Sequence, residues 1–493
     1  MRRIKKNSFI LTVVLFFLTG FLCYAQEELQ ENEPEEPQEE IIEESNGIEF
    51  NFGGKLETAH GLRWNSGRNK GAEYSLSRSI AQIKGEVVAG SAYAFLSASA
   101  EYNYRNPSRT GFKLNEAYFR YSGEIWDLSF GRQIISWGQA DGFTLTDVLS
   151  AKDASAFLAL SSDDTKLASD SIRLRFFHDI FTFEVIAIPF FTPNKLPPFS
   201  FEEGAKDALF YIELPDVYTK GAFSLPIKYT KTDEKPKMFT DTEAAARLSF
   251  FLPGIDFSLS GFYGRDKNPK FTKTGYIEKK LKKPCLDHNP ITNPYIPTLI
   301  YTKLNQEYYR IGMAGLDAAI PAGDVTIRLE GAWIGERYFE AKKTLKKEPS
   351  PVEIFQQTPD NINLIFEESK PKHQLLMLAG LDWNKSSWFI SAQYFEDLIL
   401  NHKDDIERPM HKGFVSLNIS KTFLRETLKL SASGAIDINY GSTFSTYAVD
   451  YSLTDNIHVI LGGDIYTKGY DGKGDFAQLN KISSIWIKGR FSW

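Results

Sequence analysis

Cysteine is almost absent from this sequence of 493 residues, which contains only Cys23 and Cys285. Cys23 falls within the signal peptide that the N-terminal pattern predicts, so the mature chain would keep a single thiol. One thiol cannot close an internal disulfide. The fold must therefore be held together without covalent cross-links, even in an oxidising compartment.

Long apolar runs are also missing. After residue 25 no stretch is long and apolar enough to form a transmembrane helix, and the mean hydropathy is -0.30. Inside a bilayer only helices and closed barrels pair all of their backbone polar groups internally. If this chain crosses a membrane, it must do so as a β-barrel.

Metal-ligating patterns are absent as well. The seven histidines show no ligand spacing such as His-x-x-x-His, and only one cysteine would remain. The stretch at 471–475, Asp-Gly-Lys-Gly-Asp, lacks the length and the glutamate of a dedicated calcium loop, so a plain turn is the favoured interpretation. We expect no metal, and nothing in the sequence indicates a cofactor.

The N-terminus has the pattern of a secretory signal peptide. Cationic side chains at positions 2, 3, 5 and 6 precede an apolar stretch from 9 to 22, and Cys23-Tyr24-Ala25 provides a cleavage site. We therefore expect residues 1–25 to be removed. A lipoprotein acylated at Cys23 is the alternative, but it requires a small residue where Leu22 stands.

The next segment, residues 26–46, is acidic. It contains ten glutamates together with Pro34 and Pro37, and this composition cannot bury enough apolar surface to offset the entropy of ordering. We expect a disordered periplasmic segment. The net charge of the chain is -6, of which the signal contributes +4 and this segment -10, so the remainder is neutral.

Residues 47–493 alternate apolar and polar side chains in repeated segments of roughly ten residues. Aromatic residues make up 14% of the chain, which fits the aromatic girdles of a membrane barrel. No stretch has the composition of an interdomain linker. The pattern predicts an all-β fold: one transmembrane antiparallel β-barrel in the outer membrane of a bacterium, with eighteen strands, or sixteen if the weakest segments merge.

The links between these predicted strands alternate in length, which indicates the topology. Short links rich in turn residues would be periplasmic, and long links would be extracellular. The short links lie near 90–91, 123–124, 178–179, 253–254, 322–323, 384–385, 425–426 and 454–455. The long links lie near 65–73, 105–111, 133–166, 191–240, 265–305, 339–371, 399–411 and 467–481, with one tight link at 440–441.

The C-terminus, residues 485–493, alternates strictly and ends on an aromatic residue. Ile485, Ile487, Phe491 and Trp493 would face lipid together. This segment resembles the C-terminal strand of bacterial outer-membrane barrels, which the assembly machinery recognises by its alternation and terminal aromatic residue. The resemblance implies that Phe491 and Trp493 are the assembly signal. An edge strand of a soluble β-protein is the alternative.

Strand parity predicts which charges face the lumen. An arginine that faced lipid near the midplane would cost about 2 to 4 kcal/mol, so cations that alternate with apolar residues should point inward. Charges that only pair across the wall of a plugged interior are the alternative. The predicted pore-lining cations are Arg78, Lys84, Arg120, Arg173, Arg175, Arg247, Arg328, Lys488 and Arg490.

Residues 130–153 carry the most specific motif of the chain. They contain Gly-Arg-Gln at 131–133, Trp137-Gly138, and Asp147-x-Leu-Ser-x-x-Asp153. This pattern resembles an uncharacterised family of porin-like outer-membrane β-barrels related to phosphate-selective and alginate-export porins. The resemblance implies a substrate-translocating or diffusion channel. Because phosphate-selective relatives are often trimers, it also implies a homotrimer as one oligomeric state.

The long link that follows this strand would fold inward at residues 136–165, because apolar residues such as Leu145 and Leu149 need burial. Its aspartates would then face the arginines of the wall and create a transverse field that filters polar solutes. An exposed surface loop is the alternative. The expected functional residues of this constriction loop are Trp137, Asp141, Asp147 and Asp153.

Together these features indicate an outer-membrane porin-like channel for passive or facilitated diffusion of small polar solutes. The expected partners are outer-membrane lipids, the barrel-assembly machinery and a small polar solute, with no nucleic acid. A surface-exposed adhesin or ligand-binding barrel is the alternative, favoured by the large links at 265–305 and 339–371. We do not expect an enzyme, although a Ser, His and acid set on adjacent strands would be invisible in one sequence.

Overall fold

The structure is a computed structural model, and its description covers most of the chain after residue 46. The residues described are 47–63, 74–138, 144–155, 165–205, 208, 210–220, 223–234, 237–281, 295–342, 362–365, 369–403 and 405–493. The expected signal peptide and acidic segment lie outside these residues, as does Asp141 of the expected constriction loop.

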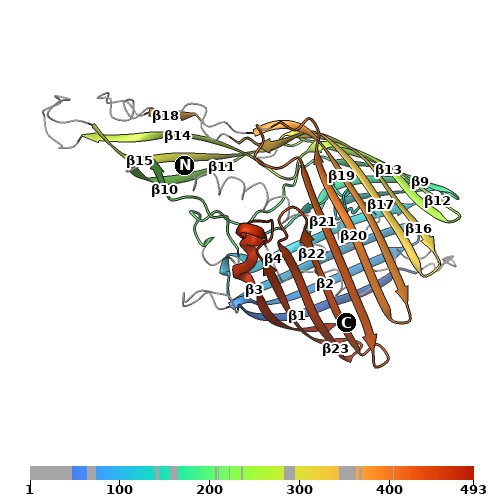
Figure 1. Cartoon of the computed structure of the whole chain (residues 1–493). Coiled ribbons are helices and arrows are strands. Elements are labelled where there is room, and N and C mark those ends of the chain that lie inside the picture. The colour runs from blue at the N-terminus through green and yellow to red at the C-terminus, as the bar shows by residue number, and fades with distance from the viewer. Residues whose placement is uncertain are drawn as a thin grey trace.

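Eighteen antiparallel strands form a closed barrel (Figure 1). Each strand pairs with the next, and β25 (Ser484–Ser492) pairs with β1 (Glu49–Arg63), which closes the sheet without a free edge. This number confirms the prediction of eighteen barrel strands and excludes the alternative of sixteen. The strands between are β2 (Tyr74–Ala89), β3 (Ala92–Asn103), β4 (Gly111–Ser122), β5 (Trp126–Gln133), β8 (Ser169–His178), β9 (Phe181–Ile188), β12 (Glu243–Leu252), β13 (Ile255–Arg265), β16 (Arg310–Ala322), β17 (Val325–Glu340), β19 (Ser369–Lys385), β20 (Trp388–Ile399), β21 (His411–Phe423), β22 (Leu428–Asp437), β23 (Thr443–Thr454) and β24 (Ile457–Thr467).

The alternation in the sequence becomes two different surfaces of the wall. On β19, Met377 and Leu381 are 40% and 54% exposed, whereas Leu378 and Asp382 are 4% and 5% exposed. The exposed apolar set forms the outer surface, where lipid would contact it, and the alternate set faces the lumen. The protein is therefore a bacterial outer-membrane barrel that crosses the membrane many times.

The links follow the predicted alternation of short and long. At the short link between β12 and β13, Gly254 has φ +84°, a left-handed conformation that favours glycine. The predicted link at 384–385 is displaced by two residues, because β19 continues through Lys385 and the turn falls on Ser386 and Ser387, which have φ +49° and +69°. Positive φ at both central residues matches the right-handed twist of the strands that a two-residue turn joins.

Three of the long links contain a second sheet that was not predicted from the sequence. Its five strands are paired in the order β10, β11, β15, β14 and β18, and the sheet projects from the loop-bearing end of the barrel (Figure 1). Tyr276 and Tyr301 stack across it with ring centroids 4.9 Å apart. Its strands are β10 (Val217–Lys220), β11 (Phe223–Asp233), β14 (Lys270–Leu281), β15 (Tyr295–Glu307) and β18 (Ile362–Ile365).

The remaining regular elements are short. A two-stranded sheet pairs β6 (Ala151–Lys152) with β7 (Lys166–Leu167), and the 3₁₀ helices are η2 (Pro107–Arg109), η4 (Tyr470–Gly472) and η5 (Ala477–Ile482). In the part of the chain that the structure describes, no helix is long and apolar enough to cross a membrane.

The closing strand generates a prediction about assembly. Trp493 exchanges two backbone hydrogen bonds with Gly54 of β1, at 3.0 and 3.1 Å, and Phe491 stacks on Trp493 at 5.6 Å. We expect removal of residues 491–493 to abolish the heat-modifiable, folded form in outer membranes while leaving export across the inner membrane intact. Tyr447→Ala, which removes an outward aromatic residue of β23, is the control. Normal surface levels of the truncated protein would refute the prediction.

Candidate functional site

The link between β5 and β8 contacts the inner wall of the barrel through Trp137, Leu145 and Leu149. Trp137 is 2% exposed, and its indole Nε1 donates a hydrogen bond of 2.7 Å to Glu184 of β9. Glu184 has the lumen-facing parity, because its neighbours Phe183 and Val185 are exposed on the outer surface. Glu184 also accepts a 2.5 Å bond from Arg173. Glu184 is thus a shared partner of Trp137, a predicted loop residue, and Arg173, a predicted pore-lining residue.

Apolar contacts also hold this loop against the inner wall, on the strands β16, β17 and β19. Leu145 and Leu149 are 4% and 1% exposed and belong to one buried cluster with Ile311, Ile334 and Leu376 of β16, β17 and β19. Burying a leucine side chain contributes about 1.5 to 3 kcal/mol. The same residues on an exposed loop would lose this contribution, which is the physical reason for the inward fold.

The Trp-Gly pair of the motif has a specific structural role. Gly138 has φ +107°, and a Cβ atom there would lie 2.9 Å from Glu330 Oε1 and 2.8 Å from Thr144. Glu330, on β17, accepts a 2.6 Å hydrogen bond from the backbone N–H of Leu145. Glycine is therefore required for the loop to approach this wall carboxylate.

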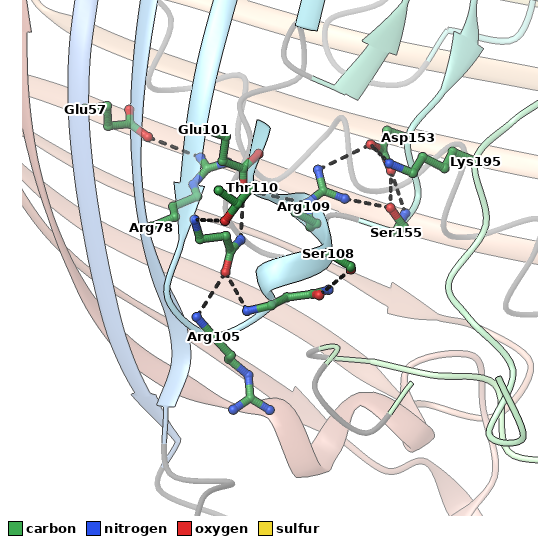
Figure 2. Close-up of polar contacts among 12 residues, drawn as sticks. Glu57, Arg78, Glu101, Arg105, Ser108, Arg109, Thr110, Asp153, Ser155 and Lys195 are labelled. Carbon is green, nitrogen blue, oxygen red and sulfur yellow. Dashed lines mark hydrogen bonds and ion pairs between the residues drawn. The ribbon is translucent and has the colours of Figure 1, made fainter. Parts of the chain in front are cut away.

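A polar clamp joins this loop to two other links (Figure 2). Arg109 of η2, in the β3–β4 link, lies 3.3 Å from Asp153 Oδ2 and donates a 2.7 Å bond to Ser155. Lys195, in the β9–β12 link, lies 3.6 Å from the same Asp153 oxygen. Burial alone would raise the pKa of the Asp153 carboxyl, but Arg109, Lys195 and the hydrogen bonds from Ser155 outweigh it and hold that pKa below its usual range.

The loop aspartates do not pair with the wall arginines in the way that the sequence analysis expected. Asp153 pairs with Arg109 and Lys195, which both come from links. Asp147 is 8% exposed, and neither of its carboxylate oxygens has a hydrogen-bond partner in the described part of the chain.

The predicted pore-lining cations mostly pair with carboxylates of the wall itself. Six of the nine form such pairs, so much of their charge is neutralised locally. The pairs are Arg78 with Glu57 at 3.2 Å, Arg490 with Glu57 at 3.3 Å, Arg173 with Glu184, Arg175 with Asp127 at 2.5 Å, Arg247 with Asp317 at 2.9 Å, and Arg328 with Asp382.

The other three predicted pore-lining cations have different surroundings. Arg120 lies 4.6 Å from the ring centroid of Tyr93, and Lys488, which is 3% exposed, lies 4.7 Å from the Trp486 ring. Lys84 is exposed. Arg132, from the Gly-Arg-Gln stretch at 131–133, belongs to β5 and lies 3.5 Å from Asp170 of β8.

The link between β24 and β25 packs against the inner wall as well, a contact that was not predicted from the sequence. Phe476, Leu479 and Ile482 belong to the same buried cluster as Leu145 and Leu149. The only sequence signal was their spacing of three residues within a link otherwise rich in glycine and charge.

An ion pair anchors this second link. Asp475, in the stretch interpreted as a plain turn, pairs with the fully buried Lys412 of β21 at 2.7 Å. Among the described residues no group of three or more His, Cys, Asp or Glu side chains is placed to hold a metal ion.

Comparisons with known proteins give structural similarity alone, since no family model and no curated protein matches the sequence. OccAB1 of Acinetobacter baumannii aligns with TM-score 0.46 and 10% identity over 90% of this chain and 96% of that chain. Salmonella typhi OmpF, in a complex with daunomycin, aligns with TM-score 0.40 and 8% identity over 91% and 98%. The anion-selective porin from Comamonas acidovorans aligns with TM-score 0.39 and 9% identity over 91% and 100%.

These TM-scores lie below 0.5, so what those proteins bind or transport is not transferred to this chain. The resemblance of residues 130–153 to phosphate-selective and alginate-export porins remains a hypothesis.

The clamp generates a prediction about the stability of the loop. Arg109→Gln should accelerate hydrogen exchange of residues 144–155, because breaking a buried ion pair costs about 3 kcal/mol of stability. We take the lower end of the usual range, since Lys195 would still lie near Asp153 in the variant. Because the folded-state pKa of Asp153 lies below the unfolded value of about 3.9, the stabilisation is complete above that pH and is lost as pH falls through the folded-state pKa. Acid should therefore accelerate exchange in the wild type more than in the variant.

Arg132→Gln is the matched control for this prediction. It removes a partly exposed pair on the outer surface, which is worth at most about 1 kcal/mol. Equal exchange in Arg109→Gln and Arg132→Gln would contradict the role of the clamp.

Proposed function

We propose that this chain is a porin-like channel for passive or facilitated diffusion of small polar solutes, and that residues 136–165 form its constriction. The observation that carries the proposal is the contact of this loop with the inner wall. Trp137 donates a hydrogen bond to Glu184, and the backbone N–H of Leu145 donates one to Glu330. Side chains alone cannot fill a barrel of about eighteen strands, so a loop held inside it determines the width of the passage.

The charges of the wall support a passage that is not strongly selective by sign. Six predicted pore-lining cations are ion-paired, and the chain from residue 46 onward carries no net charge. Polar solutes of either sign could therefore enter. Selection would depend on the width at the loop and on its local charges.

The remaining parts of the proposal concern export and assembly. Residues 1–25 would direct secretion, and residues 26–46 would remain in the periplasm. The barrel-assembly machinery would recognise Phe491 and Trp493. Outer-membrane lipids would surround the barrel, and a homotrimer is the proposed assembly.

A second candidate function is a ligand-binding surface. The five-stranded sheet at the loop-bearing end favours it, because a channel wall does not require such a sheet. Conductance in a planar bilayer separates the candidates, since a surface receptor without a passage would give no discrete open steps.

Replacement of residues 136–165 with a short Gly-Ser linker tests the constriction. We expect single-channel conductance in potassium chloride to rise severalfold, because the passage would widen where this loop is removed. The control is a deletion within residues 282–294, between β14 and β15, which should leave conductance unchanged. Unchanged conductance of the linker variant would eliminate the constriction.

A further inference from the structure

A cavity of about 100 Å³ lies between the β5–β8 loop and the inner wall. Its apolar lining comes from Leu145 and Val148 of the loop and from Ile311, Ile334 and Leu376 of the wall. An apolar cavity of about 150 Å³ can hold a benzene molecule, so this volume suits the apolar group of a small solute, a group of a few heavy atoms.

Three cations that line the cavity already have carboxylate partners. Arg265 donates to Asp241 at 2.7 Å, and Lys267 donates to Glu243 at 2.5 Å. Arg337 binds both oxygens of Asp266, at 2.7 and 3.0 Å. These cations are neutralised by the protein itself.

Two other charges in the lining lack a partner. Asp147 and Lys152 are each 8% exposed, so both are more than nine-tenths buried. Neither carboxylate oxygen of Asp147 has a hydrogen-bond partner within the residues described. Lys152 lines the same cavity and forms no ion pair with those residues. Burying an unpaired charge is costly, and buried ionised groups are normally paired. The loop therefore carries an uncompensated negative charge and an uncompensated positive charge into one cavity.

We propose that this cavity binds a small zwitterion with a short apolar side chain, namely an aliphatic α-amino acid. The solute ammonium would donate to Asp147, and the solute carboxylate would accept from Lys152. Each contact is a charge-assisted hydrogen bond in a partly desolvated site, where such bonds are strong. The apolar side chain would lie against Leu145, Ile334 and Leu376. The inference rests on the proposed channel function, for which it names a solute class.

Calorimetric titration of the full mature protein in detergent with L-valine tests the proposal. Isovalerate is valine without the ammonium group, and isobutylamine is valine without the carboxylate. A site with two unpaired charges should bind valine roughly tenfold or more tightly than either analogue, because each analogue leaves one buried charge unpaired. Equal binding of valine and isobutylamine would overturn the proposal in favour of a cation site on Asp147 alone.

Two variants separate the contacts. Asp147→Asn should weaken valine binding by roughly tenfold or more and leave isovalerate binding unchanged, whereas Lys152→Gln should weaken valine and leave isobutylamine unchanged. Asp324→Asn is the control, because Asp324 pairs with Lys385 in an exposed turn at the far end of the barrel. Wild-type affinity for valine in both Asp147→Asn and Lys152→Gln would overturn the proposal.

Thermal unfolding gives a readout that a merely structural role of Asp147 would not produce. In the absence of valine, Asp147→Asn should unfold at a higher temperature than the wild type, because it removes an unpaired buried charge. Valine should raise the unfolding temperature of the wild type but not of this variant. A lower unfolding temperature of unliganded Asp147→Asn would count against the site.

Conductance of the same preparation distinguishes failure of this inference from failure of the proposed function. Open steps in potassium chloride without valine binding would overturn the amino-acid site and leave the channel intact. Valine binding without open steps would uphold the site and overturn the channel in favour of a ligand-binding barrel.

Discussion

Within the hydrocarbon core, every backbone N–H and C=O group must be paired inside the protein, because lipid offers no partner. In this chain that constraint is met by pairing β25 with β1 from Lys55 to Arg63, which leaves the barrel without an edge. Closure then requires strict alternation along every strand. Leu381 and Met377 must face lipid, and the charged residues between such positions, Asp382 among them, must point inward.

The interior of the barrel is organised by charge pairs on the inner wall and by loops that pack against it. Most inward arginines lie beside carboxylates on neighbouring strands, as Arg175 does with Asp127 and Arg328 with Asp382. Charge pairing of this kind stabilises a polar wall without filling the lumen. Near the loop-bearing end the inner wall is apolar instead, and two links pack against it through Leu149 and Phe476. The same cluster therefore stabilises the wall and holds the loops that would govern passage.

The barrel could be predicted from the sequence because its signals are local. Alternation, turn residues and the terminal aromatic strand each lie within a short window, so the eighteen strands and the order of short and long links followed from them. Parity also predicted an inner-face position for Arg173 and Arg175, which in the structure pair with Glu184 and Asp127. The displaced turn after β19 was missed, because two serines in positive φ are not a usual turn signal.

The site was less predictable because its contacts join residues that are distant in the chain. Nothing local indicates that Arg109 meets Asp153, that Trp137 meets Glu184 on another strand, or that Lys412 meets Asp475. The sheet from β10 to β18 was missed for the same reason, since its strands come from three separate links. Apolar composition indicated the inward fold of the β5–β8 loop, but only the pairing of its charges reveals that Asp147 has no partner.

Cross-linking of the loop to the wall tests the central claim, that this loop lies inside the barrel. A Cβ atom on Gly315 of β16 would lie 2.8 Å from Thr146 Cγ2 of the loop, so cysteine side chains at positions 146 and 315 would be in direct contact. In a Cys285→Ser background, the Thr146→Cys, Gly315→Cys pair should oxidise to an intramolecular disulfide in intact outer membranes. The pair of Thr146→Cys with Leu316→Cys, which faces lipid, should not. Free thiols in a correctly folded first pair would contradict the account.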